Sequence, residues 1–261
     1  MPVQNRLTQL LQSPRANLLT LYFTAGFPQL PDTLPVLEAL AQHGADIIEI
    51  GMPFSDPIAD GPTIQQSNQR ALENGMNIAR LFEQLADFRQ RVPDTPVLLM
   101  GYLNPVLQFG LERFCAQAAA LGIDGLILPD LPMREYQTRY RGLLAQHQLS
   151  HIFLITPETS ADRIRTIDAE SEGFIYAVSS SSTTGKTQGL ASEQIAYFER
   201  LQKMQLKNPF LVGFGISEAA GFRQVCQYAR GGIIGSAFIR ALEGPGAIAE
   251  KVKAFMDPIK G

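Results

Sequence analysis

The chain has 261 residues, of which 45% are hydrophobic and 18% are charged, and its formal net charge is −3. This balance excludes wholesale disorder, and the length suffices for one large domain or two small ones. Because lysine and arginine form no clustered run, nucleic acid and anionic membrane surfaces are not expected as partners.

The N-terminal segment and the two cysteines indicate where the protein works. The first 19 residues lack the continuous apolar core of a signal peptide, and no segment has the length of a membrane span. Cys115 and Cys226 lie in helix-like patterns, with no Cys or His nearby at metal-ligand spacing. They are interpreted as buried thiols of a reducing compartment, so we expect a cytoplasmic protein without a metal site.

A short apolar run, a turn and an amphipathic segment recur along the whole chain. The runs are rich in β-branched and aromatic residues, which is typical of strands covered on both faces. Eight strands are expected, at 18–26, 45–51, 96–102, 124–130, 150–156, 173–179, 209–215 and 231–237.

Helical patterns alternate with these strands, and several begin with Ser or Asp and end at Gly or Asn. They occupy 34–44, 78–92, 111–122, 134–148, 161–173, 192–204, 217–229 and 247–256. This α/β alternation predicts a single domain over 1–261, folded as a closed (β/α)8 TIM barrel rather than an open sheet. An extra helix at 6–12 is expected to cap the barrel bottom, and a short helix at 235–244 to follow the eighth strand.

The segment EIGMPFSDPIADGP at 49–62 carries the first candidate catalytic residues. Strand alternation puts Ile47 and Glu49 on one face of the second strand. If that face lines the barrel interior, the Glu49 carboxyl is desolvated and suited to proton transfer near neutral pH. The alternative is a Glu49 that pairs with an arginine at the barrel rim. Asp56 and Asp60 lie on the loop, where either side chain can instead cap its own turn.

The segment IEIGMPFSDPIADG resembles the signature of the tryptophan synthase alpha subunit family. The resemblance covers nearly the whole chain, through TAGFP, ADGPTIQ, YLNP, DLP, GFGIS and GSA in family order and spacing. It implies a lyase that cleaves indole-3-glycerol phosphate to indole and D-glyceraldehyde 3-phosphate, in the last step of tryptophan biosynthesis. It also implies that Glu49 and Asp60 carry the chemistry.

Such a retro-aldol cleavage needs an electron sink, which aldolases usually obtain from a lysine imine or a divalent metal. No lysine lies within an expected strand, and the three histidines form no metal-ligand cluster. We therefore expect the substrate to supply its own sink once indole C3 is protonated. Glu49 is assigned to the proton transfers, while Asp60 stays ionised and stabilises positive charge at the ring N–H.

A phosphate site is expected at the end of the barrel. The segment STTGKTQG at 182–189 suggests a P-loop, but Ser180 stands where that motif needs glycine and no helix follows at once. The loops after the seventh and eighth strands are the better candidates, because barrel phosphate sites form there. We expect Gly215, Gly235 and Ser236 to present backbone N–H groups to the anion.

The resemblance adds a lid and an indole cleft. Thr184 and Gly185 occupy the Thr-Gly positions of the family's mobile lid, and Gly185 also belongs to the phosphate site. The lid departs from a common family pattern at Ser180 and at Ser182-Thr183, which puts its anchoring in question. The expected cleft residues are Tyr22, Met100, Tyr102, Ile127, Tyr176 and Phe214. Each of them can instead fill the barrel core.

The resemblance further implies a partner, a pyridoxal-phosphate-dependent beta subunit that consumes indole within an α2β2 tetramer. Contacts are expected at Asp56, Pro57, Asn104 and Pro132, and no cofactor is expected in this chain. Two alternatives stay open. One is a stand-alone indole-3-glycerol phosphate lyase of the same family, and the other is a non-catalytic, partner-only relic, which the retention of both acids disfavours.

Overall fold

The structure is a computed structural model that describes residues 2–179, 190–213 and 215–261. Over these ranges the strands form one parallel sheet, in the order β5-β4-β3-β2-β1-β9-β8-β7-β6. The strands are β1 (Leu18–Thr24), β2 (Ile47–Gly51), β3 (Val97–Met100), β4 (Gly125–Ile127), β5 (Ser150–His151), β6 (Phe153–Ile155), β7 (Ile175–Val178), β8 (Phe210–Gly213) and β9 (Gly231–Ile234).

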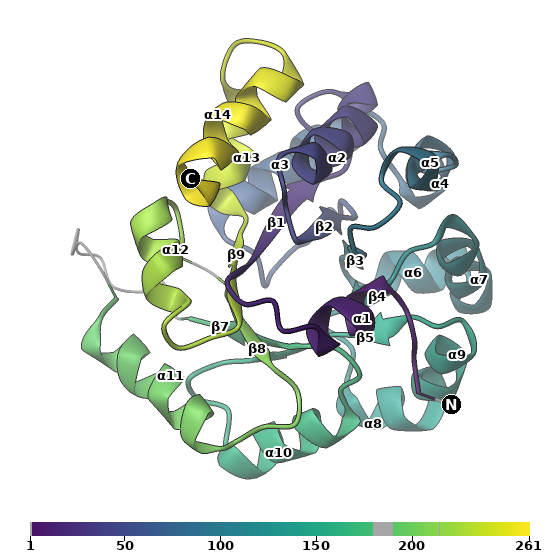
Figure 1. Cartoon of the computed structure of the whole chain (residues 1–261). Helices are drawn as coiled ribbons and strands as arrows, with labels where there is room; N and C mark the ends of the chain where they lie inside the picture. The colour runs from purple at the N-terminus through teal and green to yellow at the C-terminus, as the bar shows by residue number, and fades with distance from the viewer. Residues whose placement is uncertain (1, 180–189, 214) are drawn as a thin grey trace.

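The two ends of this strand order, β5 and β6, together take the place of the fifth strand of the barrel and so close the sheet. β5 pairs with β4 and β6 pairs with β7, and only Ile152 separates β5 from β6. The single strand expected at 150–156 is therefore two short strands that share one place in the barrel. The predicted (β/α)8 barrel is confirmed, and each of the eight expected strand regions contributes to it (Figure 1).

Helices surround the barrel, most of them on its outside (Figure 1). They are α1 (Arg6–Gln12), η1 (Leu30–Asp32), α2 (Thr33–Gln42), α3 (Pro62–Glu73), α4 (Ile78–Gln84), α5 (Phe88–Arg91), α6 (Leu103–Phe109), α7 (Leu111–Leu121), α8 (Met133–Glu135), η2 (Tyr136–Tyr140), α9 (Arg141–Gln146), α10 (Ala161–Glu170), α11 (Ser192–Lys203), α12 (Ala219–Val225), α13 (Ser236–Glu243) and α14 (Ile248–Lys260).

Most of the predicted helices are confirmed, but two of the expected segments are interrupted. The helix expected at 78–92 is broken into α4 and α5, because the chain turns between them and buries both Leu85 and Phe88. The helix expected at 134–148 begins one residue earlier and contains the π-helical segment η2. The sequence patterns gave no indication of α3 and α6.

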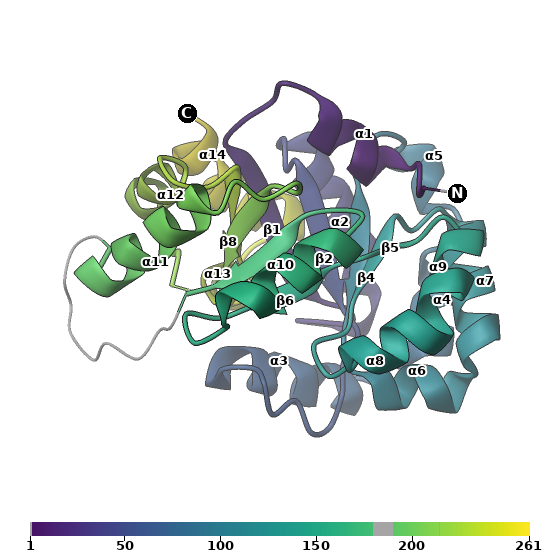
Figure 2. The ribbon, with the colours of Figure 1, turned by 90° about the horizontal axis from the view of Figure 1, so that it is seen from below.

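The N-terminal helix α1 closes one end of the barrel. Its residue Leu7 is fully buried and packs with the residues that fill the barrel interior. Figure 2 shows α1 at one end of the barrel and α3 at the other. The prediction that this helix caps the barrel bottom is confirmed, and the opposite end is where the loops that carry the candidate chemistry lie.

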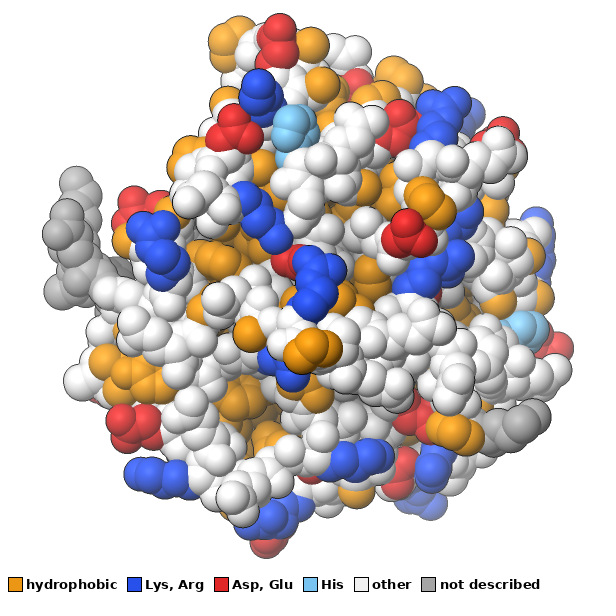
Figure 3. All heavy atoms as spheres, in the orientation of Figure 1, with side chains coloured by type: hydrophobic (Ala, Val, Ile, Leu, Met, Phe, Trp, Pro, Cys, Tyr) orange, Lys and Arg blue, Asp and Glu red, His pale blue; other side chains and the backbone are white. Residues whose placement is uncertain are grey.

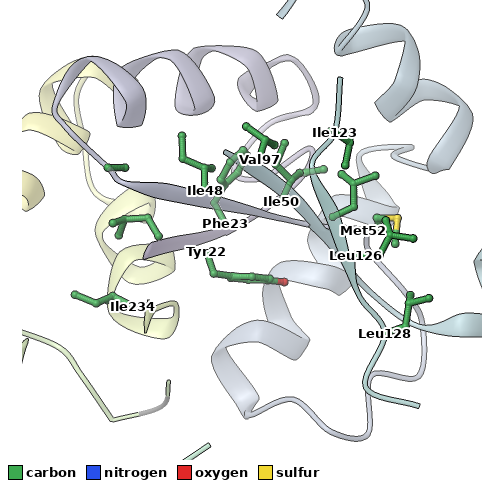
Figure 4. Packing of buried hydrophobic residues seen from close by; sticks show 14 of the residues in the cluster. Tyr22, Phe23, Ile48, Ile50, Met52, Val97, Ile123, Leu126, Leu128 and Ile234 are labelled. Atoms are coloured by element: carbon green, nitrogen blue, oxygen red, sulfur yellow. The ribbon is translucent and has the colours of Figure 1, made fainter. Parts of the chain in front are cut away.

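Strand alternation divides the hydrophobic residues into two clusters. The barrel interior contains Leu18, Ile47, Leu98, Ile127, Ile152, Phe174, Tyr176, Leu211 and Ile233. Residues of the other strand face, such as Phe23, Ile48 and Ile50, pack in the layer below the helices (Figure 4). Both faces of each strand are thus buried, which explains why the strands read as continuous apolar runs.

Two buried carboxylates tie the strands to the helices and termini. Asp46 accepts a hydrogen bond from the backbone N–H of Leu19 and forms ion pairs with Arg15 and Lys260. Asp124 accepts one from the backbone N–H of Val97, at 2.9 Å, and pairs with arginine side chains. Each of these acids is fully partnered, as a buried structural charge requires.

Charged side chains of both signs are interspersed on the face of the molecule seen in Figure 3, where no large patch of one sign forms. In the described part of the chain, no helix combines the length and the apolar character needed to cross a bilayer.

Candidate active site

Glu49 lies on β2, beside Tyr22 of β1 and Leu98 of β3 in the parallel register. Ile47, two residues earlier on the strand, belongs to the interior cluster, so alternation directs the Glu49 side chain into the barrel as well. The residue is 0% exposed. A carboxyl group is thus enclosed among apolar and aromatic side chains at the centre of the fold.

Neither carboxyl oxygen of Glu49 has a hydrogen-bond partner among the described residues, and no arginine pairs with it there. Burial raises the pKa of Glu49 from 4.5 to about 8. Asp46 and Asp124 are also buried but are held by hydrogen bonds and ion pairs. Glu49 therefore has no comparable structural task, and its raised pKa keeps it protonated near neutral pH, ready to donate a proton.

Asp60 lies on the loop between β2 and α3, directly before Gly61, the N-cap residue of α3. The Tyr102 hydroxyl donates a hydrogen bond to Asp60 Oδ2 at 3.1 Å and accepts one from the backbone N–H of Ala59 at 3.0 Å. Burial raises the pKa of Asp60 to about 6, and the hydrogen bond from Tyr102 opposes this rise. At neutral pH Asp60 is therefore mostly ionised while Glu49 is mostly protonated.

Tyr22 and Tyr176 lean into the site over two glycines. A Cβ atom on Gly51 would lie 2.6 Å from Cζ of Tyr22, and one on Gly213 would lie 2.5 Å from Cζ of Tyr176. In both pairs the glycine stands two residues beyond the register partner of the tyrosine. Both rings therefore lean toward the end of the barrel that carries Asp60, and only glycine leaves room for them. Figure 4 shows the Tyr22 ring on the opposite side of the strands from Ile48.

Tyr22, Asp60 and Tyr176 border a cavity of about 620 Å³ at the carboxyl ends of the strands. Among the described residues, its walls are formed by Tyr22, Ala59, Asp60, Gly61, Pro62, Thr63, Ile64, Met100, Tyr176, Gly215, Ile216, Ser217, Ile233, Gly235, Ser236, Ala237 and Arg240. An apolar, aromatic part adjoins Asp60, and a part rich in glycine and serine adjoins α13. The volume suits a small aromatic ring joined to a polar chain.

The part of the cavity beside α13 is suited to an anion. Gly215, after β8, has a φ of 81°, a left-handed conformation that favours glycine. Gly235 is the N-cap residue of α13, so the first N–H groups of that helix, from Ser236 onward, are directed toward this part of the cavity. The cavity wall thus contains three of the four residues expected at a phosphate site, which are Gly215, Gly235 and Ser236.

The expected cleft residues divide into three groups. Tyr22, Met100 and Tyr176 are part of the cavity wall. Tyr102 does not belong to the described wall but orients Asp60, and Ile127 is fully buried in the barrel interior. Thr184, Gly185 and Phe214 lie outside the described residues.

Several wall residues were missed by the sequence analysis. Thr63 and Ile64 come from α3, a helix that the sequence patterns did not indicate. Arg240 belongs to α13 and follows Ser236 by four residues, which places both side chains on one helix face. That spacing, together with the predicted phosphate site, was a usable signal for Arg240.

The expected interface residues differ in exposure. Asp56, Asn104 and Pro132 are exposed, whereas Pro57 is buried within the chain. Partner contact at these four positions stays a prediction, and the burial of Pro57 means that its ring is covered within this chain. Among the described residues, no group of three or more His, Cys, Asp and Glu side chains is placed to hold a metal ion.

Comparisons with known proteins show which family the chain resembles over nearly its whole length. A family model described as "Tryptophan synthase alpha chain" matches residues 7–258. The tryptophan synthase alpha chain of Flavobacterium johnsoniae is 50% identical over 256 residues, which cover 98% of this chain and 100% of that relative. The one from Christiangramia forsetii is 51% identical over 255 residues, covering 96% and 99%. The solved structure of tryptophan synthase subunit alpha from Legionella pneumophila has a TM-score of 0.88 at 34% identity, covering 98% of this chain and 97% of that chain.

Proposed function

The chain belongs to the tryptophan synthase alpha chain family and is a lyase that cleaves indole-3-glycerol phosphate, and we propose that Glu49 and Asp60 perform this cleavage. The observation that carries the proposal is the difference between the two acids. Burial raises the pKa of Glu49 to about 8 and that of Asp60 to about 6. Between these values one group is an acid and its neighbour is an anion, which is the combination that the reaction needs.

The reaction breaks the bond between indole C3 and the first carbon of the glycerol chain. Protonated Glu49 donates its proton to C3, which makes the ring an indolenine-like cation that accepts the electron pair of the breaking bond. The Glu49 carboxylate formed in this step then takes the proton of the hydroxyl on the departing carbon, which becomes an aldehyde. Indole and D-glyceraldehyde 3-phosphate leave, and Glu49 is protonated again.

Asp60 stabilises the positive charge that develops on the ring. An ionised Asp60 accepts a hydrogen bond from the ring N–H, and its charge favours the cation more than the neutral ground state. Tyr102 supports this role, because its hydroxyl fixes the carboxylate and lowers its pKa. Since Glu49 is not part of the described cavity wall, we propose that its side chain turns toward the ring when substrate binds.

The rest of the cavity binds the two ends of the substrate. Tyr22, Met100 and Tyr176 enclose the indole ring, and Gly215, Gly235 and Ser236 hold the phosphate at the start of α13. Thr184, Gly185 and Phe214 remain proposed contacts, which the family resemblance supports. No metal or Schiff base is assigned to the step, because protonated indole is itself the electron sink.

We further propose that the chain docks onto a beta subunit, which alone would carry pyridoxal phosphate. Ile58 is 90% exposed and Leu107 is 47% exposed, and they are the exposed large hydrophobic residues of the described ranges. They lie on the same segments as Asp56 and Asn104, at the mouth of the barrel. Docking there would act on the loop that carries Asp60 and thereby couple the two subunits. A cytoplasmic location accompanies this biosynthetic role.

An assay of indole release from indole-3-glycerol phosphate, with and without beta subunit, tests the function. We expect slow release by the isolated chain and a severalfold higher kcat with beta subunit. No release under either condition would refute the lyase function. Full activity of the chain alone, unchanged by beta subunit, would instead identify the stand-alone lyase of the same family.

A further inference from the structure

Arg240 is a cation in the cavity wall and is not among the proposed phosphate contacts Gly215, Gly235 and Ser236. Of the described residues in the cavity wall, two have charged side chains, Asp60 and Arg240. A phosphate monoester carries a charge between about −1.5 and −2 at neutral pH, whereas a helix N-terminus provides only about half a positive charge. The backbone groups of α13 alone therefore leave most of the phosphate charge uncompensated.

The position of Arg240 on α13 directs its guanidinium toward the same place as the helix N-terminus. Arg240 follows Ser236 by one helical turn on the same face. Long side chains on a helix lean toward its N-terminus, so the Arg240 side chain is expected to extend in the direction of Ser236. Its Nη1 donates a hydrogen bond to Thr63 Oγ1 at 3.3 Å, which holds the side chain across the gap between α13 and α3.

The charge of Arg240 is not neutralised within the described part of the chain. No carboxylate there lies within 4.0 Å of its guanidinium, in contrast to Arg89, which pairs with Asp124 at 2.6 Å. A guanidinium has five N–H donors, and the bond to Thr63 uses one of them. No other side-chain hydrogen bond of Arg240 is formed with residues 2–179, 190–213 or 215–261, so its remaining donors can form charge-assisted hydrogen bonds with the oxygen atoms of a phosphate.

We propose that Arg240 is a substrate-binding residue that holds the phosphate group of the substrate together with the backbone N–H groups at the start of α13, with Thr63 positioning it. The inference rests on the proposed function, because it takes the substrate to be a phosphate ester. Its role is in binding rather than in the chemical step. It also explains how the cavity attracts a dianionic substrate although Asp60 is ionised nearby.

Calorimetric titration of Arg240→Gln with DL-glycerol 3-phosphate, inorganic phosphate and indole tests the proposal. Losing a charge-assisted pair of hydrogen bonds should weaken binding of both phosphate ligands about tenfold or more. Binding of uncharged indole should stay within about twofold, and the salt dependence of phosphate binding should decrease. In turnover, KM should rise with kcat nearly unchanged, as expected for an interaction equal in ground and transition states.

Two further variants separate this role from a structural one. Arg223→Gln removes the same charge from α12, where Arg223 is exposed in a hollow with Asn17 and Lys260, and it should bind phosphate like the unmodified chain. Thr63→Val removes the hydrogen bond but leaves the charge, so its loss should be clearly smaller than that of Arg240→Gln. The proposal would be overturned if Thr63→Val and Arg240→Gln lost the same amount of phosphate affinity, or if Arg240→Gln bound phosphate as tightly as the unmodified chain. These binding measurements decide the role of Arg240 even if the unmodified chain releases no indole, which would count against the lyase function alone.

Discussion

The hydroxyl of Tyr102 donates a hydrogen bond to Asp60 Oδ2 at 3.1 Å and at the same time accepts one from the backbone N–H of Ala59. One side chain from the end of the third barrel strand thus fixes both the loop after β2 and the acid that this loop carries. Because the bond favours the ionised form of Asp60, it counteracts the rise in pKa that burial causes.

Tyr102→Phe should raise the pKa of Asp60 further above 6, since only the burial effect remains. The acid limb of the pH profile of kcat should then move to higher pH. Turnover should fall severalfold near pH 6 and recover partly toward pH 7.5, where Asp60 ionises again. Steady-state kinetics at saturating substrate check this, and an unchanged acid limb would show that Tyr102 does not tune Asp60.

Asp60→Asn should bind substrate but turn it over about 10²- to 10³-fold more slowly, the usual cost of losing one preorganised electrostatic partner of the transition state. The neutral amide keeps the size of the side chain and offers an oxygen to the ring N–H, but it no longer stabilises the cation. Steady-state kinetics, which give kcat and KM separately, should show the loss in kcat. A change in KM alone would make Asp60 a binding residue.

Glu49→Gln should abolish indole release yet stabilise the fold at alkaline pH. The folded chain keeps the Glu49 proton up to a pKa of about 8, whereas the unfolded chain releases it near 4.5. Between these pH values the folded state binds more protons than the unfolded state, so the unfolding free energy of the unmodified chain falls as pH rises. Glutamine at position 49 does not ionise, so the variant does not show this decline.

The gain in unfolding free energy of Glu49→Gln should therefore be small near pH 4.5 and grow to a few kcal/mol, on the order of 2–4, by pH 8. Urea unfolding of both proteins at several pH values provides the comparison. If the unfolding free energies of the two proteins changed with pH in the same way over this range, Glu49 would ionise normally in the folded chain.

Gly51→Ala should disturb both the fold and the site, because the new methyl group would lie 2.6 Å from Cζ of Tyr22. Overpacking of this kind costs about 1–3 kcal/mol of unfolding free energy. Gly142→Ala is the matched control, since nothing lies within 4 Å of a Cβ atom there and α9 should tolerate or favour alanine.

In a Tyr22→Leu background, the cost of Gly51→Ala should shrink, because the ring that opposes the methyl group is gone. The difference between the two costs is the coupling energy of the pair, measured by chemical unfolding of the single and double variants. Strict additivity would contradict the close approach of Tyr22 and Gly51.

Strand positions were predictable because a strand buried on both faces leaves a continuous apolar run. The same regularity placed Glu49 on one strand face with Ile47, and the structure shows that this face lines the barrel interior. Helix α3 was not predicted because its sequence, PTIQQSNQRALE, contains few apolar residues. Its buried face has the helical spacing, but two of the four buried residues, Ser67 and Asn68, are polar. Pro62 after Gly61 was a start signal for this helix, since proline favours the first helical position.

The parts that sequence could not supply are contacts between distant segments. Tyr102 and Asp60 are 42 residues apart, and Arg240 and Thr63 are 177 residues apart. Barrel closure brings both pairs together, so no local pattern encodes them. The burial of Pro57 is a similar case, because a proline in a turn sequence is typical of an exposed loop.

The most direct test is a titration of the side-chain carboxyl carbons by NMR in the unliganded protein, with Glu49→Gln and Asp60→Asn used to assign the two signals. We expect Glu49 to titrate near pH 8 and Asp60 near pH 6, so that at neutral pH one is an acid and the other an anion. If Glu49 titrated near 4.5, as an exposed glutamate does, it would hold no proton to give to the indole ring, and the proposed mechanism would be wrong.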